Sequence, residues 1–330
     1  MDKLLVNRMK FDEAEKRKKG RKWLLLIFLI TGLISLGLWV KGRMVHGKVD
    51  LGKLTDPLEI SYVVEPTAEP ENKNFENQKN GLLSDLNNLI STSAGEYSIY
   101  VYRLNSGESY GINENEVMPA ASIMKVAVMV RVTEDVANGR MNLGDTYTME
   151  EADRATGSGP LQFELAGTSY KISDLLNYLG KNSDNTAWLM FNRRLGIDTL
   201  QDTLNEMAMT ESSYTNLTIT AKDIARMFAY IYRGKAGGET GRDAIWGYLS
   251  DSIYEDRISL GIPDGVNLVH KVGTDDGVWA DAGIILPQSG KIEPFILVIL
   301  NKGVDRNQAT NIVPEITRKI WDFESKTSGV

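Results

Sequence analysis

The sequence predicts an α+β domain in which both ends of the domain contribute strands to one antiparallel sheet. Three observations predict it. Two β-rich runs near residue 100 come first, a largely helical stretch at 122–235 follows, and three further β-rich runs precede a closing helix. Of the 330 residues, 42% are hydrophobic and 25% charged, a composition that supports a packed core. The simplest packing flanks the sheet with helices and inserts an all-helical subdomain between its strands.

The first elements of this domain follow residue 80. Leucine and isoleucine side chains in 81–92 fall on one helical stripe. Residues 96–112 hold two β-rich runs joined by an Asn-Ser-Gly turn, which predicts a hairpin. Within the helical stretch, 220–234 is a clear amphipathic helix that begins with Thr220 as its expected N-cap and ends at a glycine.

Strand character returns in the last quarter of the chain. Alternating and β-branched residues predict strands in 266–274, 277–286 and 293–303. Residues 309–323 then form an amphipathic helical pattern that closes the domain. The chain contains no internal repeat.

An apolar segment near the N-terminus predicts a membrane anchor. Residues 1–22 carry nine Lys or Arg against four Asp or Glu, and 23–40 are eighteen residues without a charge. That run can span a bilayer as a helix, with Trp23 and Trp39 as interfacial aromatics. A cleavable signal peptide is the alternative, but the basic lead is long and no small-x-small cleavage site follows. The charge bias predicts a single-pass protein with a cytoplasmic N-terminus and all later residues outside the cell.

We therefore expect four regions. They are a cytoplasmic basic tail at 1–22, a transmembrane signal anchor at 23–40, an extracellular stalk at 41–79 and a globular domain at 80–330. The stalk assignment rests on a Glu- and Asn-rich composition without periodicity, in which three of the nine prolines of the chain fall.

Composition excludes several functional classes. The net charge of −7 argues against nucleic-acid binding, which leaves a basic footprint. Without cysteine, disulfides, thiol catalysis and cysteine metal sites are excluded. Two histidines, His46 and His270, are too few for a multi-histidine metal site, and only His270 lies in the expected domain. We expect neither a metal nor a cofactor.

Ser122 and Lys125 form the first pattern with chemical content. A serine hydroxyl needs a neighbouring base to become a nucleophile, and a lysine with a lowered pKa can be that base. Positions three apart share one helix face, so both side chains meet if a helix begins at or just before Ser122. Chance alone supplies a Ser-x-x-Lys roughly once in a chain of this length. The alternative is a capped helix with a solvated lysine.

Two further patterns follow in order. Ser183-Asp184-Asn185 begins 61 positions after Ser122, and Lys271-Val272-Gly273-Thr274 begins 88 positions later. Separately, the first could be a helix-capping turn and the second a strand that ends in a turn. Chance matches are nevertheless rarer for each of them, on the order of one chain in twenty and one in six. Together they favour a catalytic serine.

With these motifs the sequence resembles the penicillin-recognising serine acyl-transferases, specifically the class A β-lactamase branch. The resemblance covers roughly residues 80–325. It includes the stretch from Gly157 to Ala187, the run GIPDGVNLVHKVGT and the following WADAGIILP. The order of expected helices and strands also agrees with the β-lactamase/DD-peptidase fold.

The resemblance implies a catalytic role for three residues. Ser122 would be the acylated nucleophile and Lys125 its proton acceptor. Ser183 would relay the proton to the leaving nitrogen.

It also implies a set of binding residues. Asn185 would hold the amide side chain of the substrate, Lys271 would supply positive charge, and Asp184 would be mainly structural. The hydroxyl of Thr274 would help to bind the substrate carboxylate. The oxyanion hole would be formed by the backbone N–H groups of Ser122 and Thr274.

The chain departs from the class A pattern in two ways. The Glu-x-x-Leu-Asn signature that provides the deacylating glutamate is missing, and its loop is shortened to about 209–218. Glu206 or Glu211 could replace that glutamate, but surface carboxylates are the alternative reading. Val272 cannot donate the hydrogen bond of the usual Ser or Thr, and no arginine soon follows the strand to bind the substrate carboxylate.

These observations predict a serine hydrolase anchored in a bacterial cell membrane, with its catalytic domain outside. The resemblance implies two partners, a D-Ala-D-Ala-type peptidoglycan stem peptide and β-lactams that acylate the protein, and the anchor implies the bilayer. One alternative is a class A β-lactamase that hydrolyses antibiotics. Another is a cell-wall-binding or regulatory domain that kept the fold and lost turnover.

Overall fold

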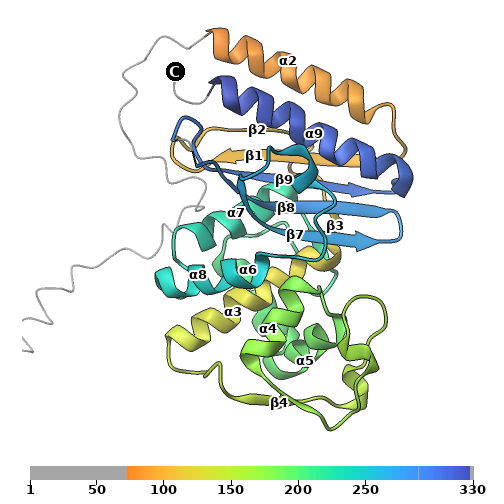
Figure 1. The fold of residues 1–330 in the computed structure, drawn as a ribbon, viewed down its shortest axis with the longest axis vertical. Coiled ribbons are helices and arrows are strands. Elements are labelled where there is room, and N and C mark those ends of the chain that lie inside the picture. The colour runs from red at the N-terminus through yellow and green to blue at the C-terminus, as the bar shows by residue number, and fades with distance from the viewer. Residues whose placement is uncertain (1–72, 289, 328–330) are drawn as a thin grey trace, which may run out of the picture. The chain divides into compact units, whose positions relative to one another are not determined.

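The computed structural model describes residues 73–288 and 290–327. Its centre is a five-stranded antiparallel sheet of order β2-β1-β9-β8-β7 (Figure 1). The strands are β1 (Glu96–Arg103), β2 (Ser109–Ile112), β7 (Asn267–Asp275), β8 (Val278–Leu286) and β9 (Phe295–Lys302). β1 pairs with β9, with Tyr97 opposite Asn301, so the predicted sheet from both ends of the domain is confirmed.

 

Two helices lie side by side over one face of this sheet (Figure 1). They are α2 (Lys73–Ile90) and α9 (Arg306–Thr327). The alternation of β9 separates two cores: Leu297 and Ile299 pack with α2 and α9, whereas Val298 and Leu300 face the helical subdomain. The rings of Phe75 and Phe323 join the two helices, with centroids 5.6 Å apart. α2 thus starts seven residues ahead of the predicted boundary at residue 80.

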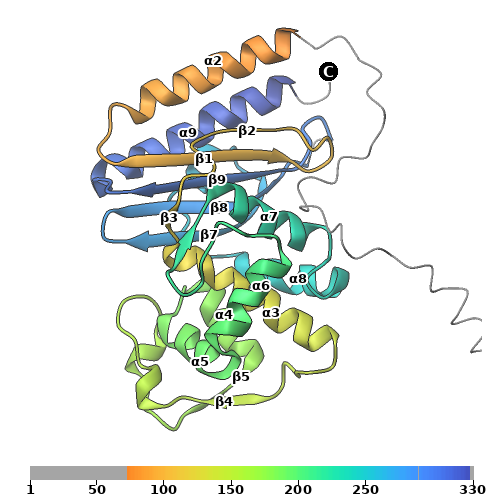
Figure 2. The same cartoon turned by 180° about the vertical axis from the view of Figure 1, so that it is seen from behind.

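The other face carries the inserted helical subdomain (Figure 2). Its helices are α3 (Lys125–Ala137), α4 (Ile172–Lys181), α5 (Asn185–Leu195), α6 (Ile197–Glu206), α7 (Ala221–Tyr232) and α8 (Gly238–Leu249). The predicted N-cap of α7 is confirmed, because the Thr220 hydroxyl accepts a hydrogen bond from the N–H of Asp223 at 3.1 Å.

The segment between α3 and α4 is less helical than the sequence predicts. It contains the short strands β4 (Thr146–Thr148) and β5 (Ser169–Lys171), which pair with each other, and 3₁₀ turns. Gly157, Gly159 and Gly167 have φ values of 106°, 92° and 93°, a backbone conformation that interrupts any helix. A second small pair, β3 (Met118–Pro119) with β6 (Thr218–Ile219), connects the sheet to the subdomain.

The predicted tail and anchor, and most of the predicted stalk, lie outside the described residues. Of the helices within 73–327 that the structure describes, none combines the length and the apolar character needed to cross a bilayer.

A buried ion pair joins the edge strand β7 to its neighbour β8. His270 Nδ1 lies 2.9 Å from Asp281 Oδ1, and Asp281 Oδ2 also accepts a hydrogen bond from the N–H of Ile258 at 3.1 Å. Burial lowers the pKa of His270, but the charge and hydrogen bond of Asp281 more than offset this effect and raise it to about 10. Burial likewise raises the pKa of Asp281, and the charge of His270 outweighs that effect and lowers it below its usual value.

Replacing His270 with alanine is expected to lower the free energy of unfolding by about 3–5 kcal/mol, because it leaves a buried carboxylate unpaired. The pKa of His270 rises on folding, so its contribution is complete below 6.5 and is lost as the pH rises toward about 10. Urea unfolding at pH 6 and pH 10 measures this, with Asn267→Ala on the exposed start of β7 as control. An equal loss at both pH values would contradict the ion pair.

Candidate active site

Ser122 lies in a 3₁₀ turn, Ala121–Met124, directly before α3. The expected α-helix therefore begins only at Lys125. Ala121 has a φ of 43°, a strained conformation for a residue with a side chain. Gly273 of β7 lies against this turn, since a Cβ there would come within 3.2 Å of Ile123 and 3.3 Å of Ala120 O. Glycine thus lets the edge strand approach the serine closely.

The ammonium of Lys125 is buried beneath this turn. Its Nζ donates to the backbone oxygen of Ser183, to Asn185 Oδ1 at 2.7 Å and to Ser183 Oγ at 3.3 Å, and it lies 5.6 Å from the ring centroid of Trp188. Burial lowers the pKa of Lys125 to about 7, although the charge of Asp184 partly opposes the shift. Lys125 is therefore partly a neutral amine near neutral pH and can accept a proton.

Ser183 connects Lys125 to the edge strand. Its hydroxyl accepts a hydrogen bond from Lys271 Nζ at 2.9 Å and lies 3.3 Å from Lys125 Nζ. Burial, together with the nearby charge of Lys125, holds the pKa of Lys271 well below its usual value. The structure thus brings together Lys125, Ser183 and Lys271, with a hydroxyl between two amines that can pass a proton. Ser122 lines the neighbouring pocket together with Asn185, which bonds to Lys125.

Asp184 holds the surrounding loop, as the resemblance implies. As N-cap of α5 its carboxylate accepts from the N–H of Ala187 at 2.8 Å, and it also accepts from the N–H of Leu161 at 2.9 Å. Asn185 adds a bond from Nδ2 to Thr156 O at 2.9 Å. These bonds fix the 155–161 loop beside Ser122.

The structure supplies an arginine that sequence reasoning missed. Arg257 precedes Lys271 by 14 residues, whereas the sequence pattern predicts such an arginine only after the strand. Its Nη2 donates to Thr274 Oγ1 at 2.6 Å, and its Nη1 donates to the backbone oxygens of Gly273 and Ala280. Trp279 stacks on the guanidinium at 3.7 Å from the ring centroid. The irregular segment around Arg257 gives no periodic signal that would have placed it there.

A pocket of about 280 Å³ opens over Ser122. Its lining consists of Ala121, Ser122, Ala155, Asn185, Trp188, Leu189, Leu217, Thr274 and Asp275. Among these described residues Asp275 is the only carboxylate. Both proposed substitutes for the missing glutamate are exposed and lie outside this lining. The alternative that Glu206 or Glu211 activates water here is therefore not supported.

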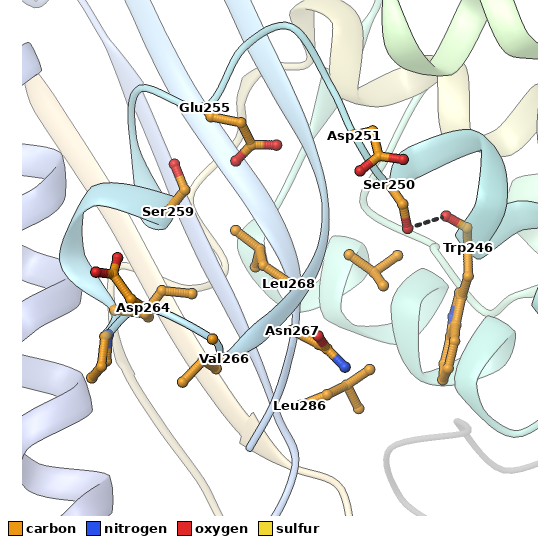
Figure 3. Close-up of a pocket in the computed structure, with 14 residues that line it drawn as sticks. Trp246, Ser250, Asp251, Glu255, Ser259, Asp264, Val266, Asn267, Leu268 and Leu286 are labelled. Carbon is orange, nitrogen blue, oxygen red and sulfur yellow. Dashed lines mark hydrogen bonds between the residues drawn. The ribbon is translucent and has the colours of Figure 1, made fainter. Parts of the chain in front are cut away.

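A larger cavity of about 610 Å³ lies at the other end of β7 (Figure 3). Figure 3 shows Glu255 and Ser259 on the segment after α8, with Asn267 and Leu268 on the strand. None of the candidate site residues lines this cavity. We therefore place the chemistry at the smaller pocket, which contains Ser122.

Comparison with known proteins identifies the family of this chain. The family model described as "Beta-lactamase enzyme family" matches residues 81–323. β-Lactamase VEB-1 of Pseudomonas aeruginosa is 21% identical over 273 residues, which cover 74% of this chain and 91% of that protein. The extended-spectrum β-lactamase PER-1 of the same organism is 24% identical over 244 residues, covering 65% and 78%.

Solved structures share the fold. PBP-A has a TM-score of 0.71 at 22% identity and covers 74% of this chain and 96% of its own. An ancestral class A β-lactamase (GNCA) has a TM-score of 0.67 at 19% identity, with coverages of 73% and 99%. Since the family model spans most of the sequence, the chain belongs to the β-lactamase enzyme family.

Proposed function

We propose that this protein forms an acyl-enzyme at Ser122 with D-Ala-D-Ala-type cell-wall peptides, and that β-lactams acylate the same serine and leave slowly. One observation carries the proposal. The pocket contains the nucleophile Ser122, and Lys125, a base with a pKa of about 7, bonds to the lining residue Asn185, but the described lining contains no glutamate to activate water.

The proposed acylation begins at Lys125. The neutral amine of Lys125 takes the proton of Ser122, and the serine oxygen attacks the substrate carbonyl. The backbone N–H groups of Ser122 and Thr274 would stabilise the oxyanion. Ser183, within hydrogen-bond reach of both lysines, passes a proton to the leaving nitrogen. Hydrolysis of the ester then requires an activated water, and the described lining of the pocket contains no glutamate to activate it.

Arg257 takes over the recognition of the substrate carboxylate. Val272 lacks a hydroxyl, but Thr274 has one, and the Arg257 guanidinium bonds to it. Burial lowers the pKa of Arg257, yet a guanidinium stays charged in proteins, whereas the amine of Lys271 loses its proton more readily. The carboxylate would therefore bind to Thr274 beside Arg257.

Replacing Arg257 with alanine is expected to slow acylation by benzylpenicillin about 10- to 100-fold, the effect of losing a charge-assisted interaction. Arg257→Lys should restore part of the rate. Benzylpenicillin methyl ester, which carries no carboxylate charge, provides the control substrate. If both variants slow acylation by the methyl ester as much as acylation by benzylpenicillin, the role of Arg257 is structural instead.

The test of the proposal uses the full chain in membranes, labelled with a fluorescent penicillin and chased with unlabelled drug. We expect an adduct that persists, that is lost in Ser122→Ala and that remains in the control Ser259→Ala. Rapid decay with product release would instead identify a β-lactamase, the activity that the names of VEB-1 and PER-1 state for those relatives. No adduct and no release of D-Ala from a stem peptide would indicate a wall-binding domain.

The proposed location is the outer face of a bacterial membrane, with 23–40 as the anchor. Its support is the uncharged run and the basic excess before it. Protease added to intact cells should digest the catalytic domain. Survival of that domain would contradict this orientation.

A further inference from the structure

One face of β7 points toward the Ser122 site. Side chains alternate along a strand, so Lys271, Gly273 and Asp275 share a face. Lys271 reaches Ser183 on this side, and Gly273 lies against the serine turn. Asp275, four residues beyond Lys271 or about 13 Å at ~3.3 Å per residue, lines the pocket itself.

The charge of Asp275 is not compensated within this pocket. Its side chain is exposed, and its Oδ1 accepts a hydrogen bond from the N–H of its neighbour Asp276 at 2.8 Å. In the part of the chain that the structure describes, it makes no ion pair, and no lysine or arginine lines the pocket. The buried ammonium of Lys125 is already bonded to Ser183 and Asn185. A carboxylate in such a place attracts a cationic ligand.

The cationic groups of the site set the direction of the substrate. Arg257 and Lys271 attract the carboxylate, which belongs to the leaving part of a D-Ala-D-Ala peptide. Thr274, where the carboxylate would bind, and Asp275 are consecutive in β7, so their side chains point to opposite sides of the strand. The acyl part of the substrate, opposite to its carboxylate, would then lie on the side of Asp275. We propose that Asp275 binds a free ammonium on the acyl part of the substrate, as in a peptide with a diamino acid before D-Ala-D-Ala. This inference rests on the proposed acylation of Ser122.

The test compares ampicillin with benzylpenicillin, which differ by one amino group on the acyl side chain. Acylation rate constants of the full chain are measured by competition with a fluorescent penicillin at about pH 6, where an α-amino group is charged. Asp275→Asn is expected to lower the ampicillin-to-benzylpenicillin ratio about 2- to 5-fold, as for a partly exposed ion pair. Benzylpenicillin itself should change by less than about 2-fold.

Asp276→Asn is the matched control, because this residue is equally exposed in the same turn but does not line the pocket. Its ratio should stay at the wild-type value. The wild type should also release D-Ala faster from a peptide that ends in Lys-D-Ala-D-Ala than from its Nε-acetylated form. This difference in rate should disappear in Asp275→Asn and persist in Asp276→Asn.

Three results would overturn this inference and leave the proposed function standing. They are an unchanged ratio in Asp275→Asn, an equal decrease in Asp276→Asn, and slower adduct decay for both penicillins without a change in ratio. The last result would assign the carboxylate to deacylation. Failure of both penicillins to acylate the wild-type chain would overturn the proposed function as well.

Discussion

Replacing Lys125 with methionine is expected to slow the acylation of Ser122 about 1000-fold, the usual contribution of a general base. The methylene stem keeps its packing, but no group remains to take the serine proton. The second-order rate constant for labelling by a fluorescent penicillin measures the effect. Lys171→Met, at an exposed lysine, should label at the wild-type rate.

The pH profile separates a base from a packing residue. Only the neutral amine accepts a proton, and the pKa of Lys125 is about 7, so the acylation rate should rise with pH and reach half its maximum near 7. Residual activity in Lys125→Met should lose this dependence. A wild-type rate that is flat between pH 5 and about 9 would contradict the assignment.

Lys125→Met should not lower the stability of the domain, although it lowers the acylation rate. The pKa of Lys125 falls from 10.5 to about 7 on folding, so between these values the unfolded chain binds more protons and stability increases with pH. At pH 7 the buried amine is therefore a destabilising element. Lys125→Met should unfold at an equal or higher urea concentration than the wild type, which excludes misfolding as the cause of lost activity.

Replacing Gly159 with alanine is expected to destabilise the domain by at least about 3 kcal/mol and to abolish labelling. The new Cβ would lie 2.0 Å from Asp184 Oδ2 and 2.4 Å from Asp184 Cα, so the backbone itself must shift. Asp184 would then lose its bonds to the neighbouring loop and to α5, and Asn185 would move away from Lys125.

Gly167 provides a matched control in the same segment. Its φ of 93° is nearly that of Gly159, but a Cβ there would meet nothing within 4 Å. Gly167→Ala should cost only the strain of the left-handed conformation, about 1 kcal/mol, and should label normally. Equal unfolding midpoints for the two variants would show that backbone strain, not the contact with Asp184, decides the effect.

The sequence contained the motifs of the site because each is short and local. Ser122, Lys125, Ser183 and Lys271 could be paired from spacing and from a family resemblance. The structure brings the last three together and places Ser122 in the pocket beside Asn185. The position of Arg257 depends on how an irregular segment crosses the sheet edge, which no periodic pattern encodes. Asp275 gains its place from strand alternation next to Gly273, and this was recognisable only once the register of β7 was known.

The helical stretch was predicted too simply for a related reason. Periodicity identifies helices such as α7, where an apolar stripe runs over several turns. Between α3 and α4 the chain instead follows glycines with positive φ and side-chain bonds to Asp184. Such tertiary contacts override local propensity.

The pairing of β1 with β9 has a consequence for biosynthesis. Tyr97 meets its neighbour Asn301 only after about two hundred further residues have been added to the growing polypeptide. Until then one edge of β1 has no partner strand, and the apolar face of the β1–β2 hairpin is not yet covered by α9. Such non-local closure slows folding and exposes the nascent protein to aggregation. Chains interrupted before β9 should therefore be captured by chaperones or degraded. Force-sensing arrest peptides should show that the sheet closes at the chain length at which α9 emerges from the ribosome.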